Sequence, residues 1–93
     1  MSQGMDKITT VLHVTIDPDS PRPVYLQVAD VIRHRINTGT ITRRVPSIRD
    51  LVGELGVSQG SVVHALEVLT AEGVIFPVRG KGYYVAERPP EQG

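Results

Sequence analysis

Residues 47–73 read SIRDLVGELGVSQGSVVHALEVLTAEG, and this stretch decides the fold. Ser47 can cap a first helix, because its hydroxyl can accept a hydrogen bond from a free backbone N–H three residues on, and Gly56 can end that helix. Ser58 can cap a second helix, which is predicted to run to Glu72. Two helices joined by a short turn that contains glycine form a helix-turn-helix motif. The apolar faces expected to be buried are Ile48, Leu51, Val52 and Leu55 in the first helix and Val62, Ala65, Leu66 and Leu69 in the second.

A further helix is predicted upstream of this motif, over residues 24–38. Pro23 suits the first turn of a helix, and Gly39 can end it. Residues 17–23 contain several prolines and are predicted to form a rigid connector before this helix. Residues 40–46 are predicted to form a short extended link after it. The apolar residues that recur every three or four positions, and therefore share one face of the helix, are Tyr25, Val28, Ile32 and Ile36.

Two short strands are predicted downstream, at residues 74–78 and 83–86. The sequence RGKG at residues 79–82 joins them as a glycine-rich hairpin tip. Tyr83 and Tyr84 alternate across the second strand, so one ring is expected in the core and the other at the surface. A hairpin directly behind a helix-turn-helix is a wing. The predicted fold class is therefore mainly α with a small β hairpin (α+β), a winged helix-turn-helix with three helices and an antiparallel wing.

We divide the chain into a winged helix-turn-helix domain at residues 17–86 and two flanking parts. The N-terminal segment at residues 1–16 holds a candidate strand, because residues 8–16 are rich in β-branched side chains that alternate between two faces. Pairing of the stretch from Thr10 to Ile16 between two copies is the interface expected for a homodimer. The polar residues 87–93 contain two prolines and are expected to form a disordered tail.

Composition narrows the class of protein. The chain has 93 residues and no cysteine, so disulfides and thiolate zinc sites are excluded. No apolar run is long enough to span a membrane and no export signal is evident, so a cytoplasmic protein is expected. The formal net charge is zero, but residues 22–86 hold eight basic and five acidic residues. This distribution suits a DNA-binding face, and on charge alone an ordinary solvated surface explains it equally well.

Three motifs carry a resemblance to a known family. They are PVYLQV at residues 23–28, PSIRDL at residues 46–51, and LGVS at residues 55–58 followed by ALEVLTAEGVI at residues 65–75. In this order and spacing they closely resemble the DNA-binding domain of the GntR family of bacterial transcriptional regulators. The resemblance covers roughly Asp17 to Ala86. It implies a sequence-specific protein for double-stranded DNA, expected to be a repressor that binds a palindromic operator as a homodimer.

The resemblance implies that the helix at residues 58–72 is the recognition helix and that the wing at residues 79–82 approaches the adjacent minor groove. Candidate DNA-binding residues on and around these elements are Arg43, Arg44, Ser47, Arg49, Ser58, Gln59, Gly60, Ser61, His64, Arg79, Gly80, Lys81 and Gly82. Other interpretations stay open for several of them. Ser47 and Ser58 are first of all helix caps, Arg49 can be a plain surface residue, and the two arginines of the link can simply be solvated. Arg33 and Arg35 of the first helix are expected to be solvated.

The sequence departs from the family pattern where DNA is expected. The link at residues 39–47 is two residues shorter than usual and lacks the family's Pro-Gly. Gln59 and Val63 stand where members often carry arginine, and Gly60 weakens the first turn by up to about 1 kcal/mol relative to alanine. Base reading is therefore expected to rest on Gln59 and His64, with glutamine suited to adenine. The family's usual C-terminal effector domain has no counterpart among residues 87–93, so no small-molecule effector is expected to bind within this chain.

No catalytic or metal-binding pattern is visible, so an enzyme, a metal site and a cofactor are not expected. The three histidines, His13, His34 and His64, lack a second ligand at metal-binding spacing. The neutral net charge and the recognition helix without cations leave a second class of function open. In that alternative, the winged helix is a protein-interaction module or a DNA-architecture accessory of a plasmid or phage.

Overall fold

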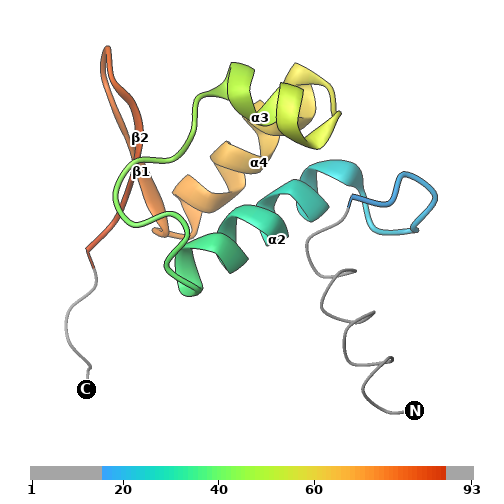
Figure 1. Ribbon diagram of the computed structural model, residues 1–93, viewed down its shortest axis with the longest axis horizontal. Coiled ribbons are helices and arrows are strands. Elements are labelled where there is room, and N and C mark those ends of the chain that lie inside the picture. The colour runs from blue at the N-terminus through green and yellow to red at the C-terminus, as the bar shows by residue number, and fades with distance from the viewer. Residues whose placement is uncertain (1–15, 88–93) are drawn as a thin grey trace.

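The computed structural model describes residues 16–87 and contains three helices and one hairpin. The helices are α2 at Val24–Asn37, α3 at Ile48–Leu55 and α4 at Gln59–Ala71, and the hairpin consists of β1 at Ile75–Val78 and β2 at Gly82–Val85. In Figure 1, α2 crosses below α4, α3 lies above α4, and the hairpin stands beside the helices with its tip level with α3. The predicted fold class is confirmed. The candidate strand at residues 8–16, apart from Ile16, and all of the tail except Glu87 lie outside the described residues.

A buried glutamine fixes the start of α2 to the connector that precedes it. Gln27 is 9% exposed, and its side-chain oxygen accepts a hydrogen bond of 2.7 Å from the backbone N–H of Asp17. Its amide nitrogen donates to the carbonyl oxygens of Asp17 and Arg22, both at 2.8 Å. A buried amide with three partners avoids the cost of an unsatisfied polar group. The glutamine of the PVYLQV motif therefore has a structural role that the sequence analysis did not assign.

Both serine caps of the helix-turn-helix are formed as predicted. The Ser47 Oγ accepts a hydrogen bond of 3.0 Å from the backbone N–H of Asp50, and the Ser58 Oγ accepts one of 3.1 Å from that of Ser61. Between the two helices, Gly56 adopts a φ of 68°, in the left-handed region that favours glycine. Val57 packs against the core in the corner that this turn creates.

The core lies between α2 and α4 and is closed by α3, β1 and the link. The predicted face of α4 is buried throughout, with Val62, Ala65, Leu66 and Leu69 at 0% exposure. From α2 the fully buried residues include Val28 and Ile32, whereas Ile36 only packs against the edge of the core. Tyr25, which the sequence places in the core, is half-buried and contacts another ring.

The link between α2 and α3 joins the sheet, which the sequence analysis did not anticipate. The N–H of Val45 donates to the carbonyl oxygen of Tyr83 at 2.9 Å. The N–H of Val85 donates to the carbonyl oxygen of Arg43 at 2.7 Å. Arg44 thereby forms a bridge with Tyr84, alongside the antiparallel pairing of β1 with β2. The link therefore holds the wing against the start of α3.

Two arginines of α2 connect this helix to the other helices, so the expectation that they are solvated is wrong. Arg33 forms ion pairs with Asp30 at 3.0 Å and with Glu72, at the end of α4, at 2.8 Å. Arg35 pairs with Glu54 of α3, and its side chain is only 19% exposed. Asp30 is a local partner, three residues before Arg33 on the same helix. Glu72 and Glu54 lie 39 and 19 positions from their arginines, which explains why no local pattern indicated those two contacts. Among residues 16–87, no helix is long and apolar enough to cross a membrane.

Candidate nucleic-acid interface

The basic residues fall into two groups that differ in their partners. Arg22, Arg33 and Arg35 all form ion pairs with acidic side chains. The hydrogen bond with Asp30 raises the pKa of the Arg22 guanidinium above its ordinary value, so this cation is charged and already engaged. Over residues 16–87, the basic side chains that form no ion pair are all exposed; they are Arg43, Arg44, Arg49, Arg79 and Lys81.

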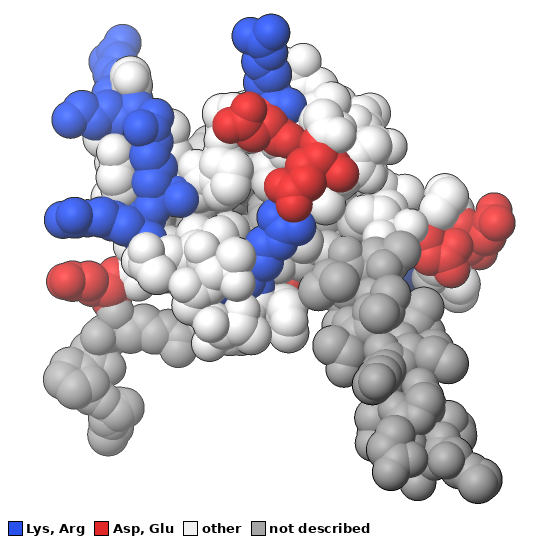
Figure 2. Space-filling view, in the orientation of Figure 1, with Lys and Arg blue, Asp and Glu red and all other residues white. Residues whose placement is uncertain are grey.

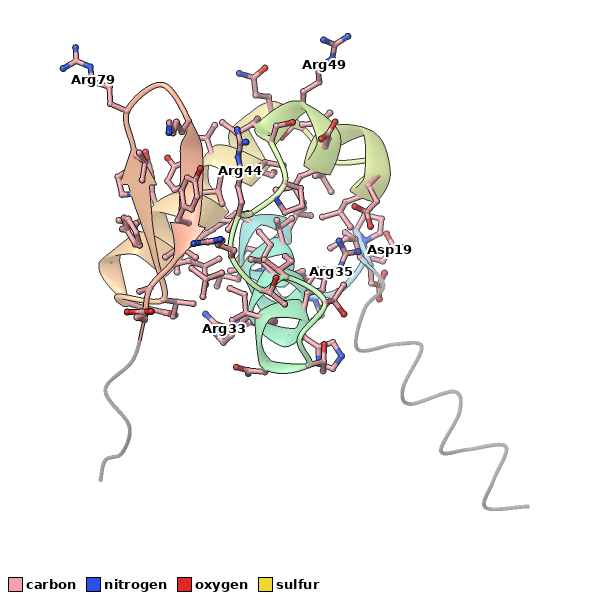
Figure 3. The ribbon with its side chains drawn as sticks, turned by 60° about the vertical axis from the view of Figure 1, so that its left-hand side comes forward. Asp19, Arg33, Arg35, Arg44, Arg49 and Arg79 are labelled. Carbon is pink, nitrogen blue, oxygen red and sulfur yellow. The ribbon has the colours of Figure 1, made fainter. Side chains whose placement is uncertain are left out.

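These unpaired cations gather at one end and along one side of the molecule. In Figure 3, Arg79 at the wing tip and Arg49 on α3 extend from the same end, with Arg44 between them, whereas Arg33 lies toward the other end. Figure 2 shows basic side chains running along the wing side. Acidic side chains lie over the helices and on the side away from the wing, with one further acidic group below the basic ones on the wing side. The result is a positive surface on a protein whose formal net charge is zero.

A cleft separates the wing from the start of α3, and we call it the wing cleft. It has a volume of about 320 Å³ and is lined by residues 44–48 and 80–83. The cations Arg44 and Lys81 border it, and the α3 cap Ser47 lies on its wall. Gly80, at the wing tip, has a φ of 78°, a conformation that side-chain-bearing residues rarely adopt. Gly82, predicted in the tip, is instead the first residue of β2. The cleft brings together candidate residues that the sequence separates by more than 30 positions.

At the start of α4, the candidate residues are exposed or half-buried. Gln59 and Gly60 are exposed, and Ser61 is half-buried. The Ser58 hydroxyl accepts the hydrogen bond from the Ser61 N–H and also donates to the Ser61 Oγ at 3.0 Å. Both serine side chains are therefore engaged with each other, whereas the Gln59 side chain forms no hydrogen bond within the described part of the chain.

His64 stacks on a ring of another helix. The rings of His64 and Tyr25 are parallel to within 3°, with 3.7 Å between their centroids. His64 is exposed and stays a predicted DNA contact, but its orientation is set by α2. No local pattern indicated this stack, because the two residues are 39 positions apart and each fits its own helical pattern.

An apolar hollow lies where α3 meets the start of α4, and we call it the α3–α4 hollow. It is lined by Ile48 and Val52 of α3, with Arg49 and Gln59 completing the wall. Both apolar residues are half-buried and pack on the core with one side while the other faces the hollow. Their helical spacing predicted that both would lie in the core alone. Their positions beside Arg49, at one residue before and three residues after it, could have indicated this surface.

The outer face of the wing carries two aromatic side chains. On the outer face of the wing, Phe76 is 45% exposed, Tyr84 lies beside it at 6.2 Å between ring centroids, and the Arg44 guanidinium lies 6.0 Å from the Tyr84 ring. Tyr83 packs on the core and Tyr84 does not, but both tyrosines are half-buried, so the expected division into a core ring and an exposed ring is only partly met. In the described region, residues 16–87, no group of three or more His, Cys, Asp or Glu side chains is placed to hold a metal ion.

Comparison with known proteins shows which family this chain matches and which solved structures resemble it. The family model described as "Bacterial regulatory proteins, gntR family" matches residues 24–85. The histidine utilization repressor of Pseudomonas putida is 39% identical over 71 residues, which cover 74% of this chain and 29% of the repressor. The chain spans a third or less of the length of several such curated relatives.

Among solved structures, the GntR-family transcription factor YtrA from Sulfolobus acidocaldarius superposes with a TM-score of 0.73 and 35% identity, covering 83% of each chain. The DNA-binding domain of AraR in complex with its operator ORX1 superposes with a TM-score of 0.65 and 33% identity. That match covers 69% of this chain and 80% of the AraR domain.

Proposed function

Because this chain belongs to the GntR family of bacterial regulatory proteins, we propose that it is a transcriptional regulator that binds double-stranded DNA in a sequence-specific manner and acts as a repressor. The observation that carries the proposal is the separation of the cations. Five exposed basic side chains without an ion-pair partner among residues 16–87 gather around the wing, the link and α3, beside the start of α4. Unpaired cations on one surface are what phosphate binding requires.

In the proposed complex, α4 enters the major groove with its N-terminal turns, and the wing tip approaches the adjacent minor groove. Arg49 contacts phosphate from α3, while Arg44 and Lys81 place a phosphate at the mouth of the wing cleft. Glycine at the wing tip lets the backbone come close to the DNA, and Arg79 follows the negative potential of the minor groove. The AraR domain that superposes on this chain is solved with operator DNA, which supports double-stranded DNA as the partner.

The proposed operator is palindromic and is bound by two copies of the chain. One winged helix covers only about 600–1,000 Å² of surface on DNA, so tight specific binding calls for two of them on half-sites. We propose pairing of residues 10–16 as the contact between copies, and the cytoplasm as the compartment. The histidine utilization repressor is named as a repressor, which supports the proposed sign of regulation.

A second candidate function is favoured by the composition of α4. The helix from Gln59 to Ala71 has no lysine or arginine and carries Glu67 on its exposed side. A winged helix that presents such a surface can serve as a protein-interaction module, or as an accessory that binds DNA without reading its sequence, as in plasmid or phage maintenance.

Fluorescence anisotropy with labelled duplex from upstream of the protein's own gene separates these functions. The titration runs from low to physiological salt, with a scrambled duplex of equal length beside it. Tight binding of the upstream duplex alone at physiological salt supports the regulator. Equal binding of both duplexes that is lost with salt indicates the accessory, and no binding at all indicates the protein-interaction module.

A further inference from the structure

We propose that this chain reads A·T base pairs in the major groove, with the Gln59 amide on an adenine and a thymine methyl group in the α3–α4 hollow. The inference rests on the proposed function, since it concerns the sequence that the same surface reads. It names the class of operator: the base pairs that face the start of α4 are A·T rather than G·C.

The first observation is the absence of arginine and lysine from α4. Guanine is recognised in the major groove chiefly by two hydrogen bonds from an arginine or lysine to its O6 and N7. The segment QGSVVHALEVLTA, which forms α4, contains neither residue. Beside it, the only cation that lines the α3–α4 hollow is Arg49, which belongs to α3.

The second observation is the state of the Gln59 side chain. Gln59 is the first residue of α4 and is exposed, and its amide has no hydrogen-bond partner within residues 16–87. A glutamine amide can accept from N6 and donate to N7 of adenine at the same time. Gly60, which follows, is exposed, and a methyl group added there would meet only the Ser58 Oγ at 4.0 Å. The bare backbone at Gly60 lets this turn approach the bases closely.

The third observation is the apolar character of the wall beside that amide. Ile48 and Val52 line the hollow next to Gln59, and Val63 lies four residues after Gln59, about 40° away around the helix. In the major groove, only thymine among the four bases presents a methyl group. A methyl placed against Ile48 and Val52 loses contact with water and gains apolar neighbours, whereas the polar edge of a G·C pair finds no hydrogen-bond partner on these two side chains.

Because of its position on α4, His64 does not face the base pair that Gln59 contacts in the proposed complex. Five residues separate the two side chains, which places them about 140° apart around the helix axis. The His64 ring also lies flat on Tyr25, which fixes it toward α2 rather than toward the hollow. A hydrogen bond from His64 to the DNA is therefore directed away from the base pair that Gln59 faces.

The test begins with in vitro selection of duplexes from a randomised pool, using the full chain at physiological salt. The expected result is a recurrent site with A·T pairs at its invariant major-groove positions. Each thymine of the selected site is then replaced singly by deoxyuridine, which removes only the methyl group. We expect one such position per half-site to weaken binding about fourfold, since burying one such group is worth roughly that factor, and the others to leave the affinity unchanged.

The matched protein variant is Gln59→Arg, at an exposed position that the core does not use. Selection with this variant is expected to change one A·T position per half-site to G·C, with the adjacent positions unchanged. A selected site with G·C at the invariant positions, or deoxyuridine duplexes that all bind equally, overturns the inference while leaving the proposed function standing. A pool that yields no recurrent site overturns both.

Discussion

At the scale of single residues, an alanine substitution is expected to raise the stability of the fold at Gly53 and to lower it at Gly56. Gly53 is exposed inside α3 with helical backbone, and a methyl group there would meet nothing within 4 Å. We expect Gly53→Ala to raise the free energy of unfolding by about 0.5–1 kcal/mol, because alanine is the better helix former. Gly56 has a φ of 68°, so Gly56→Ala forces a left-handed backbone and is expected to cost about 1–2 kcal/mol.

Thermal unfolding followed by circular dichroism measures both changes on the same chain. A difference of 1 kcal/mol corresponds to roughly 4–8 °C in Tm for a domain of this size. The two variants should therefore move the midpoint apart, one upward and one downward. Two shifts of the same sign would contradict the turn geometry assigned to Gly56.

Arg49 tests the division of the basic residues into paired and unpaired ones. We expect Arg49→Ala to weaken binding of the upstream duplex about tenfold and to lower the slope of log affinity against log salt by about 1, because one phosphate contact is lost. Arg22→Ala is the matched control, since it removes the same charge from an exposed arginine whose guanidinium is engaged by Asp30. Anisotropy titrations at several salt concentrations give both quantities. Equal losses for the two variants would indicate a general charge effect instead of a contact.

Ser58 combines a cap with a predicted DNA contact, and two substitutions separate these roles. Aspartate also caps helices well, so Ser58→Asp should keep the stability provided by the bond from the Ser61 N–H. The same change puts a negative charge beside the phosphates, and we expect binding to fall at least tenfold. Ser58→Ala should instead cost about 1 kcal/mol of stability. Chemical denaturation and DNA titration of both variants give the comparison, and Ser58→Asp with wild-type affinity would remove Ser58 from the interface.

At the scale of the elements, the contact between link and wing makes a prediction about hydrogen exchange. The amide protons of Val45 and Val85 are hydrogen-bonded across the link and β2, whereas the amide of Thr42 has no such bond. We therefore expect the first two to exchange slowly and together, and Thr42 to exchange quickly. Residue-resolved exchange by NMR measures all three. Fast exchange at Val45 with slow exchange at Val85 would show that the link is not held by the sheet.

The elements also show what a sequence can and cannot reveal. Helix periodicity, two serine caps and Gly56 are local signals, and they predicted the three helices to within one or two residues. The pairing of Arg43 and Val45 with β2 has no local signal, because an extended link looks the same whether or not a strand lies beside it.

The candidate site was also predicted only in part from the sequence. The sequence motifs supplied its residues, but the wing cleft and the α3–α4 hollow arise from residues that meet only in the folded chain. The half-buried side chains Ile48 and Val52 illustrate the difficulty. Their helical spacing is explained equally well by the core and by a surface hollow, and both explanations hold in the structure.

At the scale of the whole molecule, the positive surface is small, and this limits what one copy can bind. The unpaired cations belong to one wing, one link and one short helix, so a single copy reaches few phosphates on one side of the duplex. Each such contact adds to affinity through counterion release, and a second copy on a symmetric half-site doubles their number. Two recognition helices on one face of B-DNA require half-sites about 34–36 Å apart, which is one helical turn.

We therefore expect two copies of the chain on one palindromic duplex. Sedimentation velocity with labelled duplex measures the number bound, and a duplex of equal length with one half-site scrambled is the control. The control should bind one copy, with an affinity at least a hundredfold lower, because the second copy no longer contributes its contacts.

In the segment proposed for pairing, Leu12→Lys should give the intact duplex the same weak binding as the control, while the circular dichroism spectrum stays unchanged. One copy on the intact duplex, at an affinity equal to that for the scrambled one, would mean that the chain acts as a single winged helix.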